Sequence, residues 1–189
     1  MDETMRLLAE GCGFSAVAGL DSGSIVVREE VRAACAANKC GAYGLNWACP
    51  PACGSLEDCA AKMRAFSSGV LVQSSSALRD SFDYPAMEEA GRRHNRRLRR
   101  FAEKLKALHP RALVLGAGPC TVCRPCTYPS LPCRFPDKMA SSLEAQGIVV
   151  SELCLANNLP YYYGPGILTY TGCALFSANI FRMVKPSVA

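Results

Sequence analysis

The segment PAMEEAGRRHNRRLRRFAEKLKAL, residues 85–108, predicts the longest helix of the chain. The residues of its apolar stripe recur at alternating steps of four and three, which places them on one helical face. The stripe consists of Met87, Gly91, His94, Leu98, Phe101, Leu105 and Leu108. The next segment, RALVLGAG (111–118), is a short apolar run that ends in glycines and predicts a buried strand. We therefore expect a long helix packed against a sheet.

Shorter helices and strands alternate along the rest of the chain. We expect helices at residues 3–11, 28–38, 55–66, 136–147 and 151–158, and strands at 14–20, 69–73 and 166–176. Ser55 and Ser151 are typical helix N-caps, and Gly147 is a typical helix end. The pattern predicts an α/β or α+β fold, in which a mixed β-sheet is flanked by helices. A chain of 189 residues can build one core, so we expect a single domain over residues 1–189.

The composition is that of a globular protein, with 50% hydrophobic and 20% charged residues and a net charge of +5. The first residues, MDETMRLLAEG, are acidic and amphipathic, unlike a secretory signal. No apolar run approaches the roughly 20 residues of a membrane-spanning helix. We therefore expect a cytoplasmic protein without a membrane partner, whose thiols stay reduced. In that compartment the twelve cysteines indicate metal binding in preference to disulfides.

Four cysteines are crowded into the loop CTVCRPCTYPSLPCRFP, residues 120–136. Cys120, Cys123, Cys126 and Cys133 follow the pattern C-x2-C-x2-C-x6-C. Three cysteines at this spacing can each reach a different iron of a [4Fe–4S] cluster, and bacterial ferredoxins use the same run. Zinc is the alternative, although structural zinc sites usually pair two cysteine knuckles across a longer spacer. The spacing predicts a metal site and favours iron–sulfur over zinc.

A second cysteine-rich loop spans residues 35–53 and contains glycines and a tandem proline, as a loop does and a packed core does not. Cys35, Cys40 and Cys49 could hold three irons of a second cluster and leave the fourth iron open to a small molecule, as a catalytic zinc keeps an open position. Cys53 could instead close that site. The remaining alternative is that these cysteines add ligands to a single cluster, or shield it.

With both loops considered, the chain resembles a family of predicted metal-binding proteins of unknown function. The resemblance rests on VRAACAANKCGAYGLNWACPP (31–51), VLVQ (70–73), LVLGAGPCTVCRPCTYPSLPCRFPDKMASSLEAQGI (113–148) and LPYYYGPGILTYTGCALF (159–176). It implies that both cysteine groups belong to the family pattern and that Cys53 does not. It implies metal binding of the iron–sulfur type, but no particular reaction.

The predicted long helix carries two further candidates for function. His94 lies on its apolar stripe, where a histidine is either a hydrogen-bonded core residue or an acid–base group facing a metal centre. Six arginines lie between Arg92 and Arg100. They form either a solvated face or a docking surface for an acidic redox partner or an anionic small molecule. A single basic helix without aromatic platforms does not favour a nucleic-acid partner.

The leading expectation is a cytoplasmic protein with one [4Fe–4S] cluster and a second cysteine-bound centre, at which a small molecule is reduced or activated. An iron–sulfur oxidoreductase would fit this description, but the sequence does not decide whether the protein is an enzyme. A pure electron-transfer protein and a zinc-stabilised interaction module are the alternatives. Oligomeric state is not encoded in any pattern we find.

Overall fold

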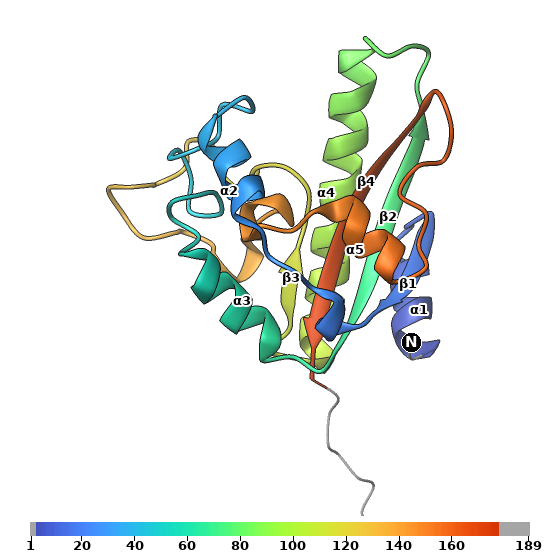
Figure 1. The fold of residues 1–189 in the computed structure, drawn as a ribbon, viewed down its shortest axis with the longest axis horizontal. Coiled ribbons are helices and arrows are strands. Elements are labelled where there is room, and N and C mark those ends of the chain that lie inside the picture. Colours follow the sequence, from blue (N-terminus) through green and yellow to red (C-terminus); the bar gives the residue numbers. More distant parts are fainter. Residues whose placement is uncertain (1–2, 178–189) are drawn as a thin grey trace, which may run out of the picture.

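The computed structural model describes residues 3–177, which form a four-stranded sheet with helices on both sides (Figure 1). The strands are β1 (Ala16–Leu20), β2 (Ser68–Ala77), β3 (Leu113–Leu115) and β4 (Ile167–Phe176). The helices are α1 (Glu3–Glu10), α2 (Glu29–Ala36), α3 (Leu56–Arg64), α4 (Tyr84–Leu108) and α5 (Val150–Ala156). Three short 3₁₀ turns complete the elements: η1 (Ser22–Ser24), η2 (Pro136–Lys138) and η3 (Glu144–Gln146).

The strand order is β1-β2-β4-β3, and all three pairings are antiparallel. The two central strands, β2 and β4, pair along their full length, from Ser68 opposite Phe176 to Ala77 opposite Ile167. Helix α4 connects β2 to β3, but β4 lies between these two strands, so the connection creates no parallel pair. The predicted class of a sheet flanked by helices is confirmed, and the sheet is antiparallel where the sequence suggested mixed directions.

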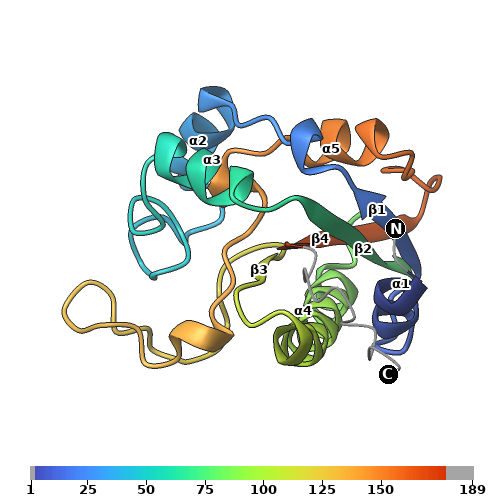
Figure 2. The ribbon, with the colours of Figure 1, turned by 90° about the horizontal axis from the view of Figure 1, so that it is seen from below.

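The helices form two layers, with α1 and α4 on one face of the sheet and α2, α3 and α5 on the other (Figure 2). Alternate side chains of each strand point to opposite faces, which gives the molecule two hydrophobic clusters. Val70 and Val72 of β2 pack with Phe101 on the α4 side. Leu71, between them, packs with Met63 and Leu153 on the opposite side. The sheet is therefore buried on both faces, and the cysteine-rich loops lie beyond its edge.

The local signals of helix α3 are confirmed. Ser55 is its N-cap, and Ser55 and Asp58 form a capping box in which each side chain accepts a hydrogen bond from the other's backbone N–H. The predicted cap of α5 was wrong, because this helix begins at Val150 and its N-cap is Val149.

The helix predicted at residues 136–147 was also wrong. Only η2 and η3 form there, because the backbone between them pairs with the end of β3. Gly116 N–H donates to Ser141 O at 2.8 Å, and Leu143 N–H donates to Gly116 O at 3.0 Å. These bonds hold the segment in an extended path, although Gly147 does end η3 in the left-handed conformation. The extended path carries residues 139–145 between the two cysteine-rich loops.

Among the described residues, no helix combines the length and the apolar character needed to cross a bilayer. Helix α4 has the length, at 25 residues, but it carries the arginine cluster.

Candidate metal centre

The four cysteines of residues 120–136 lie around one small cavity. The loop follows β3 directly and extends away from the sheet (Figure 1). Cys120, Cys123, Cys126 and Cys133 all line a cavity of about 10 Å³, together with residues 46–48 of the other loop. Phe135 and Met139 cover its apolar wall. The structure therefore brings together all four residues that the spacing predicts as one ligand set.

The three cysteines of the other group line a second and larger cavity, of about 220 Å³. Cys35 comes from the last turn of α2, whereas Cys40 and Cys49 come from the irregular segment that follows. Tyr43, Ser142 and Glu144 also line this cavity. Spacing alone could not single out these three polar residues, because two of them come from a segment about a hundred positions away.

The two cavities are neighbours in space. Ala48 and Cys120 line the smaller one, and their sequence neighbours Cys49 and Pro119 line the larger one. Cys49 lies at the junction, where its pKa is raised by burial and further by the nearby Cys120 thiol. The two groups of cysteines thus form one continuous sulfur-rich region.

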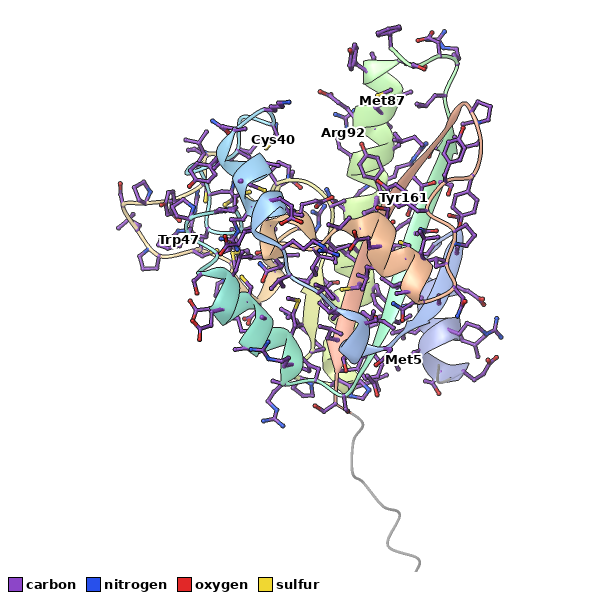
Figure 3. All side chains as sticks on the ribbon, in the orientation of Figure 1. Met5, Cys40, Trp47, Met87, Arg92 and Tyr161 are labelled. Carbon is purple, nitrogen blue, oxygen red and sulfur yellow. The ribbon has the colours of Figure 1, made fainter. Side chains whose placement is uncertain are left out.

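Trp47 connects the two loops (Figure 3 shows Trp47 with Cys40 on this side of the molecule). Its indole Nε1 donates to the carbonyl of Leu131 at 3.1 Å. Its ring meets that of Tyr128 edge to face, with 5.0 Å between the centroids. Asn46 shapes the backbone beside it, since its side-chain oxygen accepts from Ala48 N–H at 3.0 Å. These contacts hold residues 46–48 against the loop of the first cysteine group.

The thiols differ in how easily they ionise. Burial raises the pKa of Cys35 and of Cys120, which keeps these thiols protonated at neutral pH in the absence of a cation. For Cys126, burial is outweighed by hydrogen bonds from backbone N–H groups, and the pKa of its thiol is lowered. The donors are Trp47, Thr127 and Tyr128. Hydrogen bonds of this kind to a ligating sulfur tune iron–sulfur clusters.

The sulfur atoms lie around cavity walls and do not converge on a point. Four thiolates around one zinc ion, at about 2.3 Å from it, are roughly 3.8 Å apart. Within residues 3–177, no three Cys, His, Asp or Glu side chains are arranged to hold a single metal ion. In number and type the donors fit an iron–sulfur cluster, which is larger than one ion. To enclose a cubane, the smaller cavity, of about 10 Å³, must widen.

Cys53 does not line the cavity of Cys35, Cys40 and Cys49, so the structure does not place it to close that site. Its sulfur donates to Ala145 O at 3.5 Å, and it lies beside Cys59 of helix α3. The hydrogen bond from Cys53, with help from the guanidinium of Arg32, lowers the pKa of Cys59. Arg32 is a neighbour of these thiols that sequence reasoning missed. Cys59 itself is fully buried.

His94 lines neither cysteine cavity. Its side chain is fully buried between α4 and the sheet, where Nδ1 lies 3.1 Å from Ser74 Oγ. Its ring packs against Phe14 and stacks on Tyr170. Burial lowers its pKa to about 4, so the imidazole is neutral at physiological pH. Of its two sequence interpretations, the geometry corresponds to the hydrogen-bonded core residue.

The arginines of α4 fall into two groups. Arg92 pairs with Glu88 and Glu89, and Arg96 pairs with Glu89, all on the exposed face of the helix. Arg92 is marked in Figure 3. Further along, Arg99 points toward the first cysteine group, and its guanidinium donates to Thr121 Oγ1 at 3.4 Å. The helix is therefore neutralised along one part and brings positive charge to the cysteines at another.

Residues 18–176 match the family described as predicted metal-binding protein (DUF2284), and the chain belongs to this family. The match covers both cysteine-rich loops and the whole sheet except the first residues of β1. No curated protein and no solved structure is significantly similar to the chain.

Proposed function

We propose that this protein is a cytoplasmic iron–sulfur protein. Cys120, Cys123, Cys126 and Cys133 bind a [4Fe–4S] cluster, and Cys35, Cys40 and Cys49 bind a second centre with one position free of protein ligands. When bound, such centres exchange single electrons, and an open iron also acts as a Lewis acid toward a small molecule. The proposed activity is the reduction or activation of a small molecule.

One observation carries the proposal: each predicted cysteine group lines its own cavity, and the two cavities adjoin at Cys49 and Cys120. The family's description as metal-binding supports it from a separate direction. The closeness of Cys49 and Cys120 suits electron exchange between the two sites.

The chain's own residues have distinct tasks in this proposal. Phe135 and Met139 exclude water from the four-cysteine cavity, and the backbone N–H groups at Cys126 stabilise its thiolate. At the three-cysteine cavity, Tyr43 and Glu144 are the side chains able to hold or release a proton beside a bound small molecule. We assign that role to them because His94 lies in the core.

The arginines of α4 indicate a partner of negative charge. We propose that those of the six arginines from Arg92 to Arg100 that have no carboxylate partner receive an acidic redox partner or an anionic small molecule. Arg93 and Arg100 are exposed and have no carboxylate partner within the described part of the chain.

Anaerobic reconstitution with iron and sulfide, followed by quantification of both, tests the proposal. We expect a brown protein with about four irons per occupied [4Fe–4S] site. Cys120→Ala should lose the cluster of the first group, whereas Cys12→Ala, a buried cysteine outside both cavities, should keep it. A colourless protein that holds zinc without acid-labile sulfide would contradict the proposal and favour the zinc-stabilised module.

Electron transfer alone is the second candidate, and the adjoining cavities favour it as well, since neighbouring centres can relay electrons. Electron paramagnetic resonance of the reduced protein, with and without cyanide, separates the two functions. Only a centre with an open iron changes its signal when cyanide is added. An unchanged signal in a fully loaded protein would identify an electron carrier.

A further inference from the structure

A third cavity lies between helix α4 and the start of the first cysteine group. It has a volume of about 230 Å³, and one wall is formed by Asn95, Arg99 and Lys106 of α4. The facing wall is formed by residues 116–122 and 136–140, including Cys120 and Lys138. It is separate from the cavities that the two cysteine groups line, but Cys120 borders both this one and the four-cysteine cavity.

The positive side chains at this cavity form no ion pairs among the described residues, although Asp137 also lines the cavity. Within residues 3–177, Arg99, Lys106 and Lys138 form no ion pair with any carboxylate. In the part of the chain that the structure describes, the ammonium of Lys106 donates to the backbone carbonyl of Asp137 at 2.7 Å. By contrast, Arg92 and Arg96 on the same helix are paired with glutamates. The cavity is therefore lined by positive charges that are available to a ligand.

The geometry of the helix aligns these cations. Arg99 and Lys106 are seven residues apart, which is two turns, so they share a face about 10 Å apart along the axis. The opposite wall contains Gly118, where a side chain would meet nothing within 4 Å, so a ligand can approach the backbone there. The hydroxyl of Thr121, within reach of the Arg99 guanidinium, adds a neutral hydrogen-bonding group.

We propose that this cavity binds a small molecule with more than one oxyanion group, a polycarboxylate or a polyphosphate. The guanidinium of Arg99 offers paired donors to one anionic group, and Lys106 and Lys138 offer point charges to another. The inference deepens the proposed function and rests on it, because the ligand would lie against Cys120, a proposed ligand of the first metal site. It assigns the small anion, and not an acidic protein, to the Arg99 end of α4.

Calorimetric titration of the full-length metal-free protein with citrate and with pyrophosphate tests the proposal. We expect one site per chain for at least one probe, and the stronger probe identifies the anion class. Arg99→Gln and Lys106→Gln should each weaken binding by about tenfold or more, since each removes charge-assisted hydrogen bonds. Arg92→Gln is the matched control, and should leave the affinity within about twofold because Arg92 is already paired and lies outside the cavity.

Equal weakening by Arg92→Gln and Arg99→Gln would overturn the proposal, because the binding would then reflect the diffuse charge of the helix. Failure of both probes to bind at millimolar concentration would overturn it as well. Iron and sulfide contents of Arg99→Gln after reconstitution keep the two proposals apart. If Arg99→Gln loads the cluster normally but no longer binds the anion, the result supports both the cluster and the anion site. If the wild-type protein binds the anion but takes up no cluster, the result supports only the anion site.

Discussion

Trp47 Nε1 donates a hydrogen bond to the carbonyl of Leu131 at 3.1 Å, across 84 positions of sequence. This bond joins the two cysteine-rich loops, which share no regular secondary structure. Together with the edge-to-face contact of Trp47 and Tyr128, it closes the wall of the four-cysteine cavity. The indole therefore helps to position one ligand loop against the other.

Replacing Trp47 with Phe should loosen this contact. The substitution keeps an aromatic ring beside Tyr128 but removes the donor to Leu131, with an expected cost of about 1 kcal/mol for the lost hydrogen bond. Hydrogen exchange in residues 120–136 should accelerate, while exchange in β2 and β4 stays unchanged. Tyr128→Phe is the control, since it retains the ring contact. Unchanged exchange in the loop of the Trp47 variant would show that the indole does not hold the loops together.

Separate cysteine variants should empty the two proposed centres separately. Cys35→Ala removes a ligand of the second group only, so iron content after anaerobic reconstitution should fall to that of a single [4Fe–4S] cluster, about four irons. Cys126→Ala should remove the other cluster to a similar extent. If either variant abolished all iron while its far-ultraviolet circular dichroism stayed normal, the two groups would instead form one shared centre.

The stability of the protein should depend on pH through His94. Its pKa in the folded protein, about 4, lies below the ordinary value of 6.5, so between these pH values the unfolded chain binds a proton that the folded chain does not. The free energy of unfolding should therefore rise with pH through this window and reach its full value above 6.5. The shift corresponds to about 3 kcal/mol.

Urea denaturation of the wild-type protein and of His94→Gln at pH 7 and pH 4.5 measures this dependence. Carboxylates also titrate in the window, so the informative quantity is the difference between the two proteins. The variant should lose less stability on acidification than the wild type does. Equal losses would mean that His94 becomes protonated without cost.

Gly147 should not tolerate a side chain. Its φ of 81° is left-handed, and a Cβ there would collide with Leu56 Cδ2 and lie 3.3 Å from the carbonyl oxygen of Arg28. Gly41 has a similar φ of 67° but open space around it, which makes Gly41→Ala a matched control. Each substitution should cost about 1–2 kcal/mol for the backbone conformation, and Gly147→Ala should cost more because of the collision. Thermal unfolding compares them, and equal melting temperatures would contradict the steric argument.

Patterns between near neighbours in sequence predicted much of the fold correctly. The stripe of α4 and the N-cap at Ser55 depend on residues three or four positions apart. The cap is present, and the stripe is buried from His94 to Leu105, whereas Leu108 at its end is exposed. One prediction failed where a distant segment competed for the backbone. Residues 136–147 do not form the predicted helix, because Ser141 and Leu143 form backbone hydrogen bonds with Gly116. No local pattern in that segment indicates this partner.

The amino-acid order was sufficient to nominate seven cysteines and to divide them into two groups, because ligand spacing within a loop is a local property. Folding established which side chains face those cysteines: Tyr43 and Glu144 line one cavity, Trp47 lines the other, and His94 lines neither. It also left Arg99 without a counter-ion while pairing Arg92 with glutamates. These outcomes depend on the path of the chain through space, since contacts between remote segments arise only when the sheet and its layers bring them together.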